Sequence, residues 1–319
     1  MKQKSLAILL AVYEPRIDWL IELLDSLNAQ TYPNLRLYVR NDASPTLDPA
    51  QLAELLQKHV TNFPYTLRHN EQNLGSNETF AKLICDSREH YVAFCDQDDI
   101  WNPDKIANSV RLLEESDLSP RLVCTNVSVI NGKGKKIASR MEKHRRRHVF
   151  LRGKGLAPSL IYRNFVMGCT VVCRRDRALD YLPFPREIVH DHWLAFLAAS
   201  EGAIDYLAEP QMRYRVYGGN QTGVMTGVST KEDYLNRRIL VFDARVRRFS
   251  ERVSIPELDE ALAWSEARVA NFHRKCGGFR ALWRMRHVNK STSLFELFAL
   301  RMPTPIFRFL IRLVQRGKL

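Results

Sequence analysis

Apolar strand-like segments alternate with amphipathic helical segments over the first hundred residues, and this alternation predicts the fold class. The expected strands are Leu6–Val12, Leu35–Val39, Tyr65–His69 and Tyr91–Cys95. Residues 17–30, 49–60 and 77–88 lie between them and carry apolar side chains at helical spacing. Strands that alternate with helices in this order form a parallel sheet with helices on both faces. We therefore expect a Rossmann-like α/β fold with a mostly parallel sheet.

Polar residues directly follow three of these expected strands. Tyr13 comes after the first strand, Asp42 is in the turn after the second, and residues 96–99 follow the fourth. Ligands of open α/β sheets bind at the carboxyl ends of the strands. The three groups are therefore expected to lie together at one edge of the sheet.

The third group is rich in carboxylates, because Cys95–Trp101 reads Cys-Asp-Gln-Asp-Asp-Ile-Trp and contains a DxD motif. Three neighbouring carboxylates repel one another unless a cation neutralises them. Oxygen ligands suit Mg²⁺ or Mn²⁺, and such an ion could bridge to a diphosphate. The alternative is a solvated acidic turn that caps the helix after Asn102-Pro103. The position directly after an apolar strand favours the metal site.

The pattern changes along the rest of the chain. Leu122–Ile130 and Phe165–Cys173 are strand-like, residues 140–155 form a basic loop, and the chain beyond Lys231 is helical. We expect one large α/β domain, the candidate catalytic domain, over 1–228, with a first half over about 1–105 and a second over about 106–228. A helical extension over 229–319 is expected to follow.

The formal net charge of +13 is unevenly distributed. Residues 271–319 hold eleven Lys and Arg against Glu296 and so carry +10 of this total. Arg308, Arg312 and Arg316 recur at every fourth position among apolar residues, which predicts a basic amphipathic helix. Such helices lie in the membrane interface and favour anionic lipids. The alternative is a helix whose apolar side packs on the catalytic domain.

Other features indicate a cytoplasmic protein that is peripheral on the inner face of the cytoplasmic membrane. No apolar run reaches the roughly 18 residues that span a bilayer. The N-terminus lacks the small-residue cleavage site of a secretory signal, and the six cysteines are scattered without a CxxC pair. No nucleic-acid recognition module is present, so no nucleic-acid partner is expected.

The sequence resembles glycosyltransferase family 2, the inverting enzymes of the GT-A fold, and within it the bacterial rhamnosyltransferase-like branch. The matching stretches are Ala11-Val12-Tyr13-Glu14-Pro15, Val39-Arg40-Asn41-Asp42-Ala43-Ser44, Asn73-Leu74-Gly75, Phe94–Trp101, His190-Asp191-His192-Trp193, and Tyr214-Arg215 with Gly218 to Gly223. They extend over roughly residues 5–225, and the resemblance implies a nucleotide-sugar half over about 1–105 and an acceptor half over about 106–228. Their order and spacing together carry the resemblance.

The resemblance implies roles for individual residues. Asp42 would accept a hydrogen bond from N3–H of uracil or thymine, Asp96 would contact the ribose, and Asp98 would bind the metal that holds the diphosphate. Asp191 would be the general base that deprotonates the acceptor hydroxyl; the alternative is that it caps the helix it begins. The implied nucleotide-sugar site also includes Ala11, Tyr13, Glu14, Asn73, Gly75 and Gln97. The implied acceptor or sugar pocket consists of Asp99, Trp101, Gly168, His190, Trp193 and Tyr217.

One position departs from the family pattern. Relatives commonly have Tyr-Arg-x-His-Gly-Asn-Asn where this chain has Tyr214-Arg215-Val216-Tyr217-Gly218-Gly219-Asn220. The family histidine can ligate the metal, whereas a neutral phenol is a poor ligand. Either Asp98 and the diphosphate bind the metal with more water, or the metal dependence is weaker.

The resemblance therefore implies an inverting, metal-assisted transfer of a sugar to a saccharide or lipid-diphosphate-linked acceptor in bacterial O-antigen or capsule biosynthesis. The favoured donor is dTDP-rhamnose, with a UDP-hexose or UDP-N-acetylhexosamine as the alternative. A non-catalytic nucleotide-sugar-binding protein is a further alternative, supported by Tyr217. A Rossmann-type dehydrogenase would need a GxGxxG turn after the first strand, and residues 10–18 contain no glycine.

Overall fold

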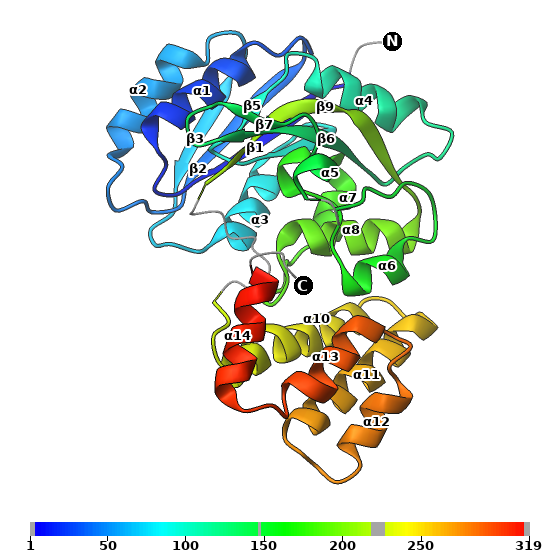
Figure 1. The fold of residues 1–319 in the computed structure, drawn as a ribbon. Helices are drawn as coiled ribbons and strands as arrows, with labels where there is room; N and C mark the ends of the chain where they lie inside the picture. Colours follow the sequence, from blue (N-terminus) through cyan, green and yellow to red (C-terminus); the bar gives the residue numbers. More distant parts are fainter. Residues whose placement is uncertain (1–3, 146–147, 218–226, 316–319) are drawn as a thin grey trace. The chain divides into compact units, whose positions relative to one another are not determined.

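The computed structural model describes residues 4–145, 148–217 and 227–315, and the chain divides into two compact units, Met1–Tyr217 and Gly218–Leu319 (Figure 1). The boundary expected between residues 228 and 229 lies close to this division and stays a prediction. Arg146, Arg147, Arg316 and the Gly218–Gly223 part of the family motif lie outside the described residues.

The first unit is built on one mixed sheet in the order β3-β2-β1-β4-β8-β6-β9-β5, with β7 paired to β6. The strands are β1 (Leu6–Val12), β2 (Leu35–Asn41), β3 (Tyr65–His69), β4 (Tyr91–Cys95), β5 (Ile100–Trp101), β6 (Leu122–Asn131), β7 (Lys136–Ala138), β8 (Val172–Arg174) and β9 (Ile204–Val216). Strands β1 to β4 are parallel, as the sequence predicted, and β8 runs antiparallel between β4 and β6. The predicted α/β fold is confirmed.

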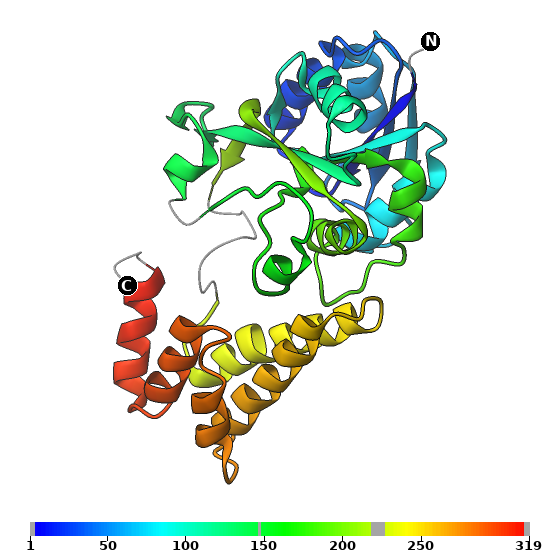
Figure 2. The same ribbon diagram turned by 90° about the vertical axis from the view of Figure 1, so that its right-hand side faces the viewer.

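Helices cover both faces of this sheet, with α1, α2 and α4 on one side and α3, α7 and α8 on the other (Figures 1 and 2). The helices of the first unit are α1 (Ile17–Asn28), α2 (Pro49–His59), α3 (Ser76–Asp86), α4 (Lys105–Glu115), α5 (Met141–His144), α6 (Ala157–Tyr162), α7 (Arg175–Asp180) and α8 (His190–Glu201). The apolar face of α1, which includes Leu20 and Leu24, is buried against Ile8 and Leu10 of β1. Helical spacing of leucines thus anchors α1 on the sheet.

The carboxyl ends of three parallel strands meet at one edge. Val12 is in register with Asn41 of β2, and Leu10 is in register with Cys95 of β4. The polar residues that follow β1, β2 and β4 therefore begin at the same edge of the sheet, which is where ligands bind in such folds.

The second unit is helical in its described residues. Its elements are α9 (Lys231–Tyr234), a π-helical turn (Leu235–Ile239), α10 (Leu240–Ser250), α11 (Pro256–Phe272), α12 (Gly278–Arg284), α13 (Lys290–Ala299) and α14 (Thr304–Gln315). A buried ion pair joins Arg268 of α11 to Glu296 of α13 at 2.6 Å, and the Tyr234 hydroxyl also donates to Glu296. These contacts tie α9, α11 and α13 together.

Helix α14 has two different faces. Phe307 and Ile311 are buried in a cluster with Tyr234, Leu235 and Leu300. On the other face Ile306 is 48% exposed, Phe309 is 60% exposed, and both arginines of the predicted stripe that the structure describes, Arg308 and Arg312, are exposed. The helix thus packs on the second unit and also presents apolar and basic side chains to solvent. In the part of the chain that the structure describes, every helix is too short or too polar to span a bilayer.

Candidate active site

Gln97 connects the ends of β1 and β4. The Tyr13 backbone N–H donates to Gln97 Oε1 at 2.9 Å, and Gln97 Nε2 donates to the Tyr13 carbonyl at 2.8 Å. Ala11 is part of β1 and half-buried, whereas the Tyr13 side chain is 43% exposed. The two side-chain bonds of Gln97 therefore fix the backbone at Tyr13 and leave its ring open to a ligand.

Glu14, which lies after β1, forms hydrogen bonds with the turn after β2. Glu14, whose φ is 45°, donates its N–H to Ser44 Oγ at 3.0 Å, and its carboxylate accepts from Thr46 N at 3.0 Å. A non-glycine residue in the left-handed region is uncommon and needs such support. Glu14 therefore fixes the edge of the expected base and ribose pocket.

Asp42 is buried and organises the Asn73-Leu74-Gly75 turn. Its carboxylate accepts from Asn70 Nδ2 at 2.7 Å, Leu74 N at 2.8 Å and Gly75 N at 2.9 Å. Gly75 has a φ of 79°, a conformation that glycine adopts without steric cost, and its N–H also bonds Asn73 Oδ1 at 2.9 Å. A carboxylate accepts at about four lone-pair positions, so these three donors leave room for a base contact, which stays a prediction.

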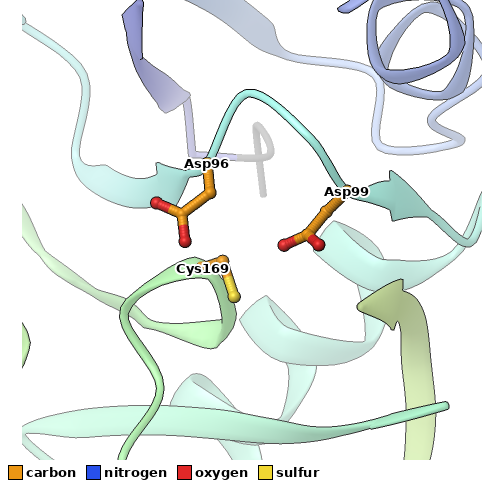
Figure 3. A group of neighbouring side chains, drawn as sticks. All are labelled: Asp96, Asp99 and Cys169. Atoms are coloured by element: carbon orange, nitrogen blue, oxygen red, sulfur yellow. The ribbon is translucent and has the colours of Figure 1, made fainter. Parts of the chain in front are cut away.

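A buried acidic group follows β4. Asp96, Asp99 and Cys169 each offer a ligand atom, and these atoms lie within 4.8 Å of one another (Figure 3). Burial and the charges of Asp98 and Asp191 together raise the pKa of Asp96 to about 7. Asp99 is fully buried and accepts from Arg215 N at 2.9 Å, while its Oδ2 has no hydrogen-bond partner. An unpaired carboxylate oxygen in this position favours binding of a cation.

Sequence reasoning missed Lys105, which lies beneath this acidic group. Its fully buried ammonium donates to the Cys169 carbonyl at 2.7 Å and lies 3.1 Å from the centre of the Trp101 ring. Burial lowers the pKa of Lys105 to about 8, and the nearby acidic groups oppose this shift. The signal was available, since Lys105 takes a core-facing position of α4 with Ser109 and Leu113.

Asp98 is hydrogen-bonded by Tyr217, the residue at the departure from the family pattern. Burial raises the pKa of Asp98, and this hydrogen bond opposes the increase. The Tyr217 ring contacts Trp19 edge-on at 4.8 Å. Arg215, which sequence reasoning also missed as a site residue, is buried and donates from Nε to the Asp98 carbonyl at 2.8 Å and from Nη2 to Glu22. The phenol therefore contacts the carboxylate that was expected to bind the metal.

Asp191 lies inside the first turn of α8, whose N-cap is Val189. Its carboxylate accepts from Gly168 N at 3.0 Å and from Asn164 Nδ2 at 3.1 Å, and it also interacts with the backbone N–H groups of Asp191 and His192 in the first turn of the helix. Burial raises the pKa of Asp191 to about 6, and these hydrogen bonds limit the increase. Asn164 was not identified from the sequence. Gly168, whose N–H donates to Asp191, directly precedes Cys169 of the acidic group, so Asp191 lies near that group, and its charge raises the pKa of Asp96.

The remaining residues of the expected acceptor or sugar pocket differ in exposure. Trp101 and Trp193 are core residues, 2% and 3% exposed, and the Trp193 indole N–H donates to the Tyr181 carbonyl at 2.7 Å. Both side chains therefore belong to the core as well, and their place in the acceptor or sugar pocket stays a prediction. His190 is enclosed by the rings of Phe80 and Phe94 at 4.4 and 5.5 Å, and burial lowers its pKa to about 4.

Comparisons with known proteins find similar sequences and structures. The family model described as glycosyl transferase family 2 matches residues 8–176, more than half of the chain. The dTDP-rhamnosyl transferase RfbG of Shigella flexneri is 24% identical over 229 residues, 68% of this chain and 74% of that protein. An uncharacterized glycosyltransferase of Rickettsia felis is 31% identical over 140 residues, 42% of this chain and only 21% of its own length.

Solved structures of the same fold include TarS 1–349 of S. aureus in complex with UDP-GlcNAc, with a TM-score of 0.61 and 17% identity over 98% of this chain and 92% of that chain. The mannosyltransferase PcManGT of Pyrobaculum calidifontis, in complex with GDP-Man and Mn²⁺, has a TM-score of 0.56 and 16% identity over 99% of this chain and 86% of that chain. Both likenesses show a GT-A fold for the chain described here.

Proposed function

Because the chain belongs to glycosyl transferase family 2, we propose that it transfers a sugar from a nucleotide-sugar donor to an acceptor hydroxyl with inversion at the anomeric carbon. One observation carries this proposal. The Asp191 carboxylate, held by Gly168 and Asn164, is bonded to the residue that directly precedes Cys169, which lies in one group with Asp96 and Asp99. A base and an acidic, cation-attracting group in one site are the two parts that such a displacement needs.

In this mechanism Asp191 takes the proton from the acceptor hydroxyl. The acceptor oxygen forms a bond to the anomeric carbon as the bond from that carbon to the diphosphate oxygen breaks on the opposite side. Gly168 N and Asn164 Nδ2 orient the carboxylate. Burial raises its pKa to about 6, which brings its basicity close to neutral pH, where a general base is most effective.

The residues of the acidic group fit the divalent cation that the family implies. Carboxylate oxygens suit Mg²⁺ or Mn²⁺, and the unpaired Oδ2 of Asp99 is a buried acceptor that a cation would satisfy. We propose that Asp98 binds the ion, that Asp96 contacts the ribose, and that Asp99, bonded to Arg215 N through one oxygen, offers the ion its other oxygen. Burial raises the pKa of the Cys169 thiol well above its usual value, so it stays protonated and is a poor ligand. When bound, the ion would neutralise charge on the diphosphate.

We propose dTDP-rhamnose as the donor, which the likeness to RfbG supports. A UDP-hexose or UDP-N-acetylhexosamine is the alternative, supported by the UDP-GlcNAc in the TarS structure. The proposed acceptor is a saccharide or lipid-diphosphate-linked intermediate of bacterial O-antigen or capsule biosynthesis. Thermal stabilisation by a panel of nucleotide sugars, with and without Mn²⁺, identifies the donor, because a ligand raises stability in proportion to its occupancy. Release of nucleoside diphosphate in a single turnover then separates an enzyme from a binding protein.

Turnover at saturating donor and acceptor is expected to fall as the pH decreases below about 6. Asp191 accepts a proton only in its ionised form, and its pKa is raised to about 6, so kcat should fall about tenfold per pH unit below this value. Above it, kcat should reach a plateau. Asp96, with a pKa raised to about 7, acts in donor binding and should affect kcat/KM instead. A kcat that stays constant down to pH values near an ordinary aspartate pKa would contradict the role of Asp191.

We also propose that the exposed face of α14 binds an anionic membrane surface at the inner face of the cytoplasmic membrane. Ile306 and Phe309 would enter the interface, and Arg308 and Arg312 would contact lipid headgroups. Each arginine contributes roughly 1 kcal/mol at most, so Arg308→Gln/Arg312→Gln should weaken binding to anionic vesicles by about tenfold to thirtyfold. Flotation measures this loss, and added salt should weaken wild-type binding.

The matched control for this pair is Arg252→Gln/Lys290→Gln, which removes two exposed charges from the same unit. Truncation before α14 is unsuitable because it would remove the buried Phe307 and Ile311. Equal flotation of the Arg308/Arg312 variant and the control would count against a membrane contact at α14.

A further inference from the structure

The second unit contains a cationic cleft that the proposed function does not use. Its volume is about 780 Å³, and Arg274, Lys275, Cys276, Gly277, Phe279, Arg280 and Arg301 line it. Four of these seven described residues are cationic and none is acidic. Within the described ranges, none of the four cations forms a salt bridge, although the chain pairs many of its other arginines. We call this group the Arg280 cleft.

The protein fixes the Arg301 side chain and the turn that carries Lys275. Arg301 Nη1 donates to Asn271 Oδ1 at 2.8 Å and to the Leu297 carbonyl at 3.2 Å. Lys275 N donates to the Ala270 carbonyl at 3.0 Å, which fixes the turn after α11. The turn lies so close to the end of α11 that a Cβ atom added to Gly278 would be 2.7 Å from the Ala270 carbonyl group. Like charges held together in this way favour an anionic ligand.

An apolar cleft of about 330 Å³ adjoins the cationic one and shares Phe279 and Arg280 with it. Its other lining residues are Trp283, Arg284 and Phe298. Phe279, Trp283 and Phe298 are 39%, 41% and 54% exposed, which is unusual for three large neighbouring apolar side chains. A cationic site beside an apolar one matches a ligand that has both a phosphate and a hydrocarbon part.

The rings of Phe279 and Trp283 are poorly suited to stacking on nucleic-acid bases. The guanidinium of Arg301 lies 4.6 Å from the centre of the Phe279 ring, and that of Arg286 lies 4.6 Å from the centre of the Trp283 ring. An arginine therefore already lies over one face of each ring. Base recognition on single strands depends on open ring faces, whereas aliphatic chains can pack against ring edges.

We propose that the Arg280 cleft binds the phosphate headgroup of an anionic membrane lipid, whose first methylene groups pack on Phe279, Trp283 and Phe298. Arginine and lysine supply charge-assisted hydrogen bonds to the phosphate oxygens. Tryptophan is enriched where a protein meets the membrane interface. This site uses other residues than the proposed contact of α14, and it stands independently of the sugar donor and of Asp191.

The test uses the full chain and vesicles of phosphatidylcholine with or without phosphatidylglycerol. Lys275→Gln/Arg280→Gln changes two exposed residues and should weaken flotation on the anionic vesicles by at least about tenfold. Arg252→Gln/Lys290→Gln removes the same charge outside the cleft and should have a much smaller effect. Equal losses in the two variants would show a general charge effect and overturn the proposal. Loss only in Arg308→Gln/Arg312→Gln would also overturn it while supporting the α14 contact.

A second measurement locates the lipid. Trp19, Trp101, Trp193 and Trp264 are buried, so Trp283 is the exposed tryptophan of the chain. Lipids brominated in their acyl chains should quench its fluorescence, and Trp283→Phe should remove this quenching. Quenching that persists in Trp283→Phe would contradict the proposal.

Two soluble probes identify the source of the phosphate. If inorganic pyrophosphate binds as tightly as vesicles and with the same dependence on Lys275 and Arg280, the ligand is a soluble anion and the lipid assignment is wrong. If a single-stranded oligonucleotide binds more tightly than vesicles and depends on the same residues, the partner is nucleic acid. Weak pyrophosphate and oligonucleotide binding is the result expected for a lipid site.

Discussion

Asp191→Asn is expected to leave donor affinity unchanged and to lower turnover by about 10² to 10⁴, the usual contribution of a general base. The amide cannot accept the proton of the acceptor hydroxyl. Donor affinity should persist because the donor-side residues follow β1, β2 and β4, whereas Asp191 is in α8. Calorimetry with the donor and single-turnover release of nucleoside diphosphate measure the two quantities separately.

The control for this variant is Asp117→Asn, which changes a carboxylate that is 87% exposed. It should turn over like the wild type. Asparagine at position 191 can keep only one of the hydrogen bonds from Gly168 and Asn164, so the melting temperature of the variant has to be compared as well. Near wild-type turnover in a folded Asp191→Asn protein would exclude this residue as the base.

The second large effect is expected for Asp98→Asn, which should abolish the Mn²⁺-dependent part of nucleoside diphosphate binding with little loss of stability. Loss of an outer-shell partner of a metal costs about 10 to 100-fold in affinity, and loss of a direct ligand should cost at least as much. Asparagine fits the same space, and its amide oxygen is a weaker ligand than a carboxylate. Titration of the diphosphate in Mn²⁺ and in a chelator gives the metal-dependent increment.

Tyr217→Phe is the companion variant for Asp98. It removes the hydroxyl that hydrogen-bonds Asp98 and keeps both the carboxylate and the ring that packs on Trp19. Metal-dependent binding should therefore persist in Tyr217→Phe. If Asp98→Asn retained full diphosphate affinity in saturating Mn²⁺, Asp98 would not be a metal ligand.

The parallel part of the sheet could be predicted from the sequence because its signals are local. Each of β1, β2 and β4 is an apolar run that ends in polar residues, and the register of the strands brings these residues to one edge. The leucine spacing of α1 likewise predicted its buried face. Sequence patterns of this kind report periodicity and strand ends directly.

Residues whose roles depend on tertiary contacts were harder to find. Arg215 reaches Asp98 and Asn164 reaches Asp191 from distant segments. The matching Tyr214-Arg215 stretch does not report which residue Arg215 contacts, and no matching stretch contains Asn164. Trp101 and Trp193 were placed in a pocket because they belong to matching motifs, but a motif does not report whether its side chains are buried. The pattern of α14 was also ambiguous, because the helix carries apolar residues on two faces. One face packs on the second unit, and the other is exposed.

Lys105 helps to stabilise the acidic group after β4 when no ion is bound. Its ammonium is a covalent part of the fold that lies among Asp96, Asp99 and Cys169 and offsets part of their charge. A site without such a resident counter-ion would depend more on bound protons or a metal to bury its carboxylates together. Here the fold can form first, and on the proposed mechanism the metal can enter with the donor and depart with the released diphosphate. With this lysine the protein would stay folded after the ion leaves, as a catalyst that exchanges its ion in each cycle requires.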